Sequence, residues 1–233
     1  MLPLLAVSWM WTKSMARSVM TWVMLALPTG IAWAVQHAGA SQNPSFNPLW
    51  LVFAQLMTGL MLASGHWLQE RDQGTWDTLR ISAVPLGGLI AMQALLVSGL
   101  ALGSEVLVFV VIHGDAPWSL PLFVAMLAGT IPATMLGVLI GVAGRSGRSG
   151  NMLATVVMLV LFLGTITVSG LTHYALLAIL LHGLPSILAM SALNAGLAGH
   201  YAAFRISLGL SAWFLVMVAL LTWTLRRRYL NGQ

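Results

Sequence analysis

Six long apolar segments recur along the chain and constrain its fold more than any other feature. Each is long enough to cross the hydrocarbon core of a membrane as one helix, which takes about 20 mostly apolar residues. Only 6% of the 233 residues are charged, which leaves too little polar surface to cover a soluble domain of this size. The sequence therefore predicts an all-α integral membrane protein and argues against a soluble enzyme, a nucleic-acid-binding domain or a disordered chain. The expected spans cover residues 18–36, 48–68, 85–112, 120–143, 151–170 and 206–225.

The basic residues are distributed unevenly between the two sides of these spans. Six spans place nine of the ten Lys and Arg residues on one side and only Arg205 on the other. Cytoplasmic loops carry an excess of Lys and Arg, so both termini are expected to be cytoplasmic. No long linker divides the chain, and a single transmembrane domain over residues 1–233 is expected. The nine residues on the cytoplasmic side are Lys13, Arg17, Arg71, Arg80, Arg145, Arg148 and Arg226–Arg228.

Two further segments are expected to be helical without spanning the membrane. Residues 2–16 combine Trp9, Trp11 and Lys13 with apolar side chains, which predicts a helix lying in the interface with its indoles at headgroup depth. Residues 171–199 are apolar enough for a seventh span, but histidine, glycine, proline and asparagine interrupt them. A seventh span would move the C-terminal arginines away from the other basic residues. We therefore favour a broken outer segment before the last span, either packed at the outer face or re-entrant.

The connection between the second and third spans, residues 70–85, is the most informative part of the chain. Gly74 is expected to end the second helix, and Thr75 to cap a short new helix with Asp77 in its first turn. Pro85 is expected to open the third span at a position that needs no N–H donor. A short amphipathic helix on the cytoplasmic side suits the docking of a soluble partner. Its other side chains are Trp76, Leu79 and Arg80.

This connection resembles the signature of ABC-2-type transporter permeases. In that family an acidic–basic pair is followed by Gly-Thr, an acidic residue, a leucine and a proline that opens the third span. Trp76 replaces the usual aliphatic residue, and Val84 stands where Thr or Ser is common. The order of an interfacial helix, six spans and a broken outer segment is also similar to the family. The matching residues are Glu70, Arg71, Gly74, Thr75, Asp77, Leu79 and Pro85.

The resemblance implies a half-transporter of the bacterial inner (plasma) membrane that exports a substrate. A second permease copy, expected as a homodimer, would complete the path through the lipid membrane. Two separate ABC ATPase subunits would hold the ATP and Mg, and residues 70–80 would be the coupling helix that docks on them. The chain itself is expected to have no catalytic site, no directly bound cofactor or metal, and no nucleic-acid partner. Lys13 is the only lysine, so the chain contains no phosphate-binding loop motif.

A close alternative within the same class is the haem-exporter B permease of cytochrome c maturation. Residues 127–130 and the Arg-Ser-Gly loop after the fourth span resemble that permease. The basic triplet at the end of the chain differs from it.

Glu105 is an acidic residue inside the third span. An intramembrane carboxyl group is a functional candidate by default, and it would line the path or carry a proton. A proton- or ion-coupled carrier that uses Glu105 is therefore an alternative function. A neutral acid paired to a neighbour is the simpler interpretation.

Three other patterns are weaker. Residues 144–147 fit the G-x-S-G pattern of rhomboid intramembrane proteases, but Ser146 would lie in a basic cytoplasmic turn. Five histidines fall on the outer side without the spacing of metal ligands. His66 and Glu70 are four residues apart, which predicts a contact near a helix end.

Two pairs of glycines are spaced four residues apart within predicted spans. Gly99 and Gly103 form one pair, and Gly137 and Gly141 form the other. This spacing lets helices approach closely. The sequence leaves open whether each contact lies within one chain or between two copies.

Overall fold

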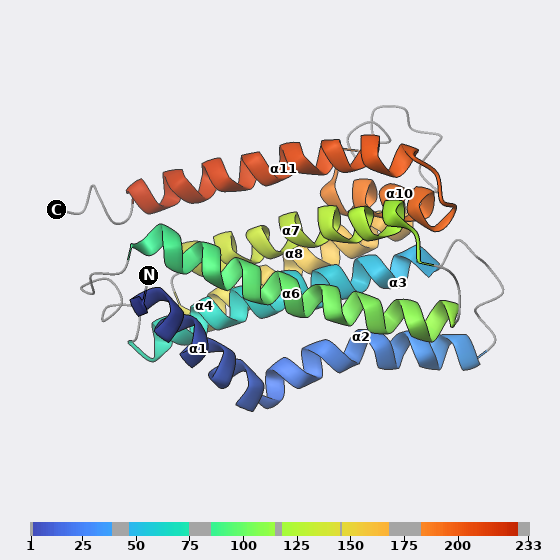
Figure 1. Ribbon diagram of the computed structural model, residues 1–233. Coiled ribbons are helices and arrows are strands. Elements are labelled where there is room, and N and C mark those ends of the chain that lie inside the picture. Colours follow the sequence, from blue (N-terminus) through green and yellow to red (C-terminus); the bar gives the residue numbers. More distant parts are fainter. Residues whose placement is uncertain are drawn as a thin grey trace.

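The computed structural model describes residues 2–38, 47–74, 85–114, 118–144, 146–167 and 183–227, and all regular structure there is helical (Figure 1). Six helical stretches are long and apolar enough to cross a membrane, which confirms the predicted all-helical, multi-span class. Each begins and ends within about four residues of its expected bounds. They are α2 (Val19–His37), the continuous stretch Asn47–Asp72, α6 (Leu86–His113), α7 (Leu120–Ala143), α8 (Gly147–Thr167) and α11 (Ala202–Leu225).

Helix α7 is the centre of the bundle. It packs against α11, α10 (Pro185–Leu197), the second span and α6. In Figure 1, α2 and α11 lie on opposite sides of this centre. Both outer helices leave most of their side chains uncovered by protein, whereas α7 and the second span are largely buried. The core therefore lies between α7 and the second span.

Glycines let α7 approach the second span closely. A Cβ atom on Gly137 would lie 2.2 Å from the carbonyl oxygen of Leu60, and one on Gly141 would lie 2.6 Å from Cβ of Trp67. Neither position has room for a side chain. This glycine pair therefore makes its contact within the chain. By contrast, a Cβ on Gly99 or Gly103 would meet nothing within 4 Å.

The second span contains a wide helical stretch that the apolar pattern does not predict. It begins as α3 (Asn47–Ala54), continues as the π-helix η3 (Gln55–Met61) and ends as α4 (Leu62–Asp72). π-helical turns are rare and occur frequently at functional sites. Here η3 carries the buried polar side chains of Gln55 and Thr58 into the core.

Helix α1 (Leu2–Arg17) occupies the segment expected to be interfacial and meets α2 at an angle (Figure 1). Ser18 separates the two helices with an extended backbone, at φ −80° and ψ 118°. Trp9 is exposed, as expected for an interfacial indole, but Trp11 is only 1% exposed. Its ring packs edge-on against His66 and Trp67, with centroids 5.4 and 6.0 Å away. Trp11 therefore anchors α1 to α4.

The broken segment before the last span is described only in part. Helix α10 has 13 residues, which is too short to cross a membrane. Residues 168–182 lie outside the described part of the chain. The described half therefore agrees with a short helix that does not span.

Candidate functional sites at the basic end and around Glu105

Most described basic residues lie at one end of the bundle, which we call the basic end. Arg71, Arg148, Arg226 and Arg227 lie at the helix termini that share this end, and α1 approaches it as well (Figure 1). Arg205 lies in the first turn of α11, at the opposite end. The described residues thus show the charge asymmetry that the sequence indicates.

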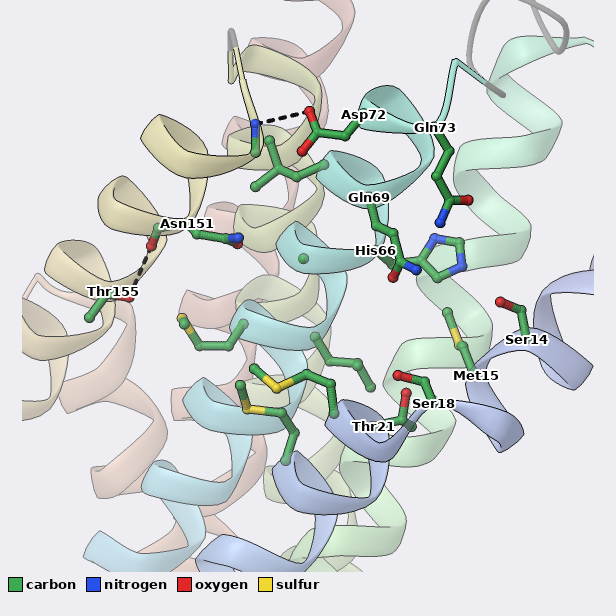
Figure 2. Close-up of a pocket in the computed structure, with 17 residues that line it drawn as sticks. Ser14, Met15, Ser18, Thr21, His66, Gln69, Asp72, Gln73, Asn151 and Thr155 are labelled. Atoms are coloured by element: carbon green, nitrogen blue, oxygen red, sulfur yellow. Dashed lines mark hydrogen bonds between the residues drawn. The ribbon is translucent and has the colours of Figure 1, made fainter.

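The last turn of α4 is fastened to the connection between α7 and α8. The Nη2 atom of Arg71 donates to the carbonyl oxygen of Val142 at 3.1 Å. On the next residue, Oδ1 of Asp72 accepts from the backbone N–H of Gly147 at 3.2 Å (Figure 2). Gly147 is the first residue of α8, where a helix favours a negative charge. Two adjacent side chains therefore tie three spans together, and we call this pair of contacts the α4 clamp.

Both flanks of the predicted docking segment have the expected backbone. Gly74 follows α4 with φ +71°, a conformation that glycine adopts without strain. Pro85 precedes α6, and its carbonyl oxygen accepts from the N–H groups of Gly88 and Leu89. Pro85 is thus the N-cap residue of the third span. The residues between these flanks, Thr75, Trp76, Asp77, Leu79 and Arg80 among them, lie outside the described residues.

Glu70 belongs to the matched signature, yet its side chain is buried in the bundle. Oε1 of Glu70 lies 3.8 Å from Nε2 of His66, so the predicted contact between these two residues is present. This contact of Glu70 lies within α4, and the neighbouring Arg71 and Asp72 make the contacts to α7 and α8.

Glu105 lies at the meeting point of three spans. Its carboxyl group is fully buried and accepts hydrogen bonds from Nε2 of Gln55, at 3.0 Å, and from the hydroxyl of Thr130. Gln55 is the first residue of η3, and Thr130 lies in the middle of α7. The structure therefore pairs Glu105 with neutral neighbours. It does not line an open path in this conformation.

A cavity of about 560 Å³ lies between the α1–α2 junction, α4 and α8. Figure 2 shows hydroxyl, amide, carboxylate and imidazole side chains around it, with methionine side chains deeper inside. Ser18, Gly65 and His66 are among the residues that line it. The sequence does not predict this cavity, because its polar residues come from three separate segments.

The weaker patterns have structural explanations. The hydroxyl of Ser146 lies 3.0 Å from the hydroxyl of Ser149 and accepts from its backbone N–H, which is a helix-capping arrangement. His37 stacks on Trp33, and His113 on Phe109. Within the described ranges no group of three or more His, Cys, Asp or Glu residues could hold a metal ion.

Comparison with models of protein families, with curated proteins and with solved structures finds no match to the chain.

Proposed function

We propose that the chain is the membrane-spanning permease subunit of an ATP-binding cassette exporter. The α4 clamp is the observation that carries this proposal. Residues 75–84 connect α4 to α6, and the clamp joins the end of α4 to α7 and α8. A partner that pulls on residues 75–84 would therefore move four spans together. Such a mechanical connection is what a subunit needs when its energy comes from a separate ATPase.

The remaining parts of the proposal follow from the charge pattern and the resemblance. Both termini lie on the cytoplasmic side of the bacterial inner membrane, because the basic end faces the cytoplasm. A second copy of the chain and two ATPase subunits complete the transporter. Haem export is one possible activity of this class, and the α4 clamp does not distinguish it from other substrates.

Co-purification tests the proposal. The tagged chain is isolated from its native membrane in mild detergent, and the eluate is assayed for ATP hydrolysis and for a subunit with nucleotide-binding motifs. We expect both in the wild type and their loss in a Thr75→Pro, Asp77→Arg double variant. Tyr201→Arg is the matched control, because Tyr201 is exposed at the opposite end of the bundle. Absence of an ATPase from the wild-type eluate would contradict the proposal.

A second candidate function, a proton- or ion-coupled carrier, is favoured by one observation. Glu105 is a fully buried carboxyl group within a span, and such groups serve as relays in transporters. Replacing Glu105 by Gln removes the titratable proton and keeps the shape. If the Glu105→Gln variant loses transport and no ATPase co-purifies with the wild type, the carrier is favoured. Transport that persists and requires ATP would favour the exporter.

A further inference from the structure

We propose that the cavity between the α1–α2 junction, α4 and α8 binds an anionic amphiphile. The phosphate or carboxylate head would lie at the α1–α2 junction, and the apolar body would extend between the methionine side chains. Four independent features of the cavity support this assignment.

The first feature is a buried imidazole without a hydrogen-bond partner. His66 lines the cavity, is 8% exposed, and neither of its ring nitrogens makes a hydrogen bond. The nearest acid, Glu70, lies 3.8 Å away, which is beyond hydrogen-bond distance. Buried polar groups in folded proteins are normally hydrogen-bonded. An imidazole that lines a cavity and lacks a partner indicates that an occupant supplies one.

The second feature is the start of α2. Ser18 is the N-cap residue, but its side chain makes no capping hydrogen bond. The first N–H groups of a helix have no partner within it, and the helix dipole is positive there. Helix N-termini of this kind bind anions. The carbonyl oxygen of Ser18 accepts from the N–H groups of Thr21 and Trp22, which leaves the first two N–H groups of α2 for an anion. Ser18 and Met20 line the cavity, so the start of α2 lies at its edge.

The third feature is the charge beside this helix start. A second recess, of about 480 Å³, shares Ser14, Ser18 and Gln69 with the cavity and is also lined by Lys13 and Arg17. Among the described residues that line the main cavity, Asp72 is the only Asp, Glu, Lys or Arg, and so the only one with a permanent charge at neutral pH. Its carboxylate already accepts from the N–H of Gly147. Lys13 and Arg17 are the charged residues of the recess that shares Ser18, and they favour an anionic head there.

The fourth feature is the apolar interior. Met15, Met24, Met61 and Leu62 are apolar lining residues of the cavity, and methionine adapts to ligands of irregular shape. From Gln73 at the rim to Met61 is roughly 18 Å along the helix, about half the thickness of the hydrocarbon core. The cavity therefore extends into one leaflet and suits a body with an acyl-like chain better than a small polar ion.

This site belongs to the chain alone and requires no partner. A role of the bound amphiphile as the transported substrate, unlike the binding itself, rests on the proposed function. The binding test below uses the purified chain without an ATPase. Its failure would thus be distinct from a failure of the co-purification test.

Photocrosslinking tests the proposal. The purified chain is placed in phosphatidylcholine nanodiscs and titrated with a single-chain alkyl phosphate that carries a diazirine. Crosslinked peptides are mapped by mass spectrometry. We expect crosslinks in residues 14–24 and 61–73, and competition by dodecyl phosphate. Equal competition by inorganic phosphate or by dodecyltrimethylammonium would overturn the proposal.

Gly65 offers a clean way to fill the cavity. It lines the cavity, and a Cβ atom there would meet nothing within 4 Å, so the side chain of a Gly65→Leu variant starts in open space and extends into the cavity. We expect at least a tenfold loss of probe affinity. Gly103→Leu is the matched control, because a Cβ atom on Gly103 would also meet nothing within 4 Å and Gly103 does not line the cavity. Wild-type affinity in Gly65→Leu would overturn the proposal.

The exposed basic residues allow a second test that does not alter the core. Lys13→Gln with Arg17→Gln should lower affinity for the phosphate probe at least tenfold and leave binding of the matched long-chain alcohol unchanged. Arg226→Gln with Arg227→Gln is the control, since these residues lie outside both recesses. An equal loss of affinity for the phosphate probe in both double variants would overturn the assignment of the head group to the α1–α2 junction.

The same assay distinguishes two sources of such an amphiphile. Competition by phosphatidylglycerol would support an ordinary anionic lipid as the occupant. Absence of that competition, with dodecyl phosphate still competing, would support a dedicated lipid-like substrate. Both results support an anionic amphiphile site.

Discussion

Gln55 and Glu105 meet inside the bundle, where Nε2 of the amide donates to Oε2 of the carboxyl group at 3.0 Å. Gln55 is also the residue at which the second span changes from α- to π-helical. The polar contact therefore lies at the start of the wide helical stretch. Because Thr130 binds the other carboxyl oxygen, this contact fixes η3 against both α6 and α7.

Removing one partner of this contact should destabilise the protein. Glu105→Leu leaves the buried amide of Gln55 with only a long hydrogen bond, of 3.5 Å, to the carbonyl oxygen of Met126, and a buried polar group that loses its main partner costs about 1–3 kcal/mol. The Gln55→Leu, Glu105→Leu double variant should recover part of that loss, because both polar groups are then absent. Thermal unfolding of the purified variants in detergent measures their order of stability. A double variant that is less stable than the wild type by the full sum of the two single-variant effects would contradict the coupling.

The two glycine pairs should differ in their tolerance of side chains. Gly137→Val would force its Cβ into the backbone of Leu60, and overpacking of this kind typically costs about 1–3 kcal/mol. Gly99→Val has free space around it and should leave the unfolding temperature of the isolated chain nearly unchanged. Comparable destabilisation by both variants would show that the close approach of α7 is not the cause.

The α4 clamp should matter more for transport than for partner binding. Asp72→Ala removes the acceptor for the N–H of Gly147, a hydrogen bond worth about 1 kcal/mol, or more for a charged acceptor. We expect an ATPase subunit to co-purify as in the wild type while ATP-dependent transport falls several-fold. Asp72→Asn retains an acceptor for this N–H group, and transport should fall less in this variant than in Asp72→Ala. Equal transport in Asp72→Ala and the wild type would argue against the clamp as the mechanical connection.

The orientation can be measured with single cysteines, since the natural chain contains none. Arg227→Cys lies at the basic end and Tyr201→Cys at the opposite end. In intact cells a membrane-impermeant maleimide should label Tyr201→Cys, and it should label Arg227→Cys only after the membrane is opened. The reverse pattern would place the basic end outside.

The helical class and the bounds of the spans could be predicted because they depend on a one-dimensional property. Apolar runs of about 20 residues have few alternatives to a membrane helix. Gly74 and Pro85 were predictable for a similar reason, since each acts on its own backbone. Partners across the bundle were not predictable. Nothing in the sequence near Trp11 indicates that it packs on His66.

The sequence contains a pattern of polar residues that corresponds to the cavity. Ser14, Ser18 and Thr21 recur at helical spacing, as do His66, Gln69 and Gln73. The second set is a polar stripe on one face of α4 and its C-cap, whereas the first set has that spacing in the sequence but is divided between α1 and α2 by the extended residue Ser18. What sequence could not supply is that the two sets face one another, because that depends on the angle between α1 and α2 at Ser18.

The π-helix η3 also sets the direction in which the side chains of α4 point. Each residue added to or removed from an α-helix turns everything beyond it by about 100° and shifts it by 1.5 Å. A π-helical turn holds about one residue more than an α-helical turn. If residues 55–61 took α-helical spacing with no residue deleted, the helix beyond them would therefore turn by about that angle, swing His66 out of the cavity and carry Asp72 away from Gly147. The directions of the side chains at the basic end therefore depend on an irregular helical stretch halfway across the bundle.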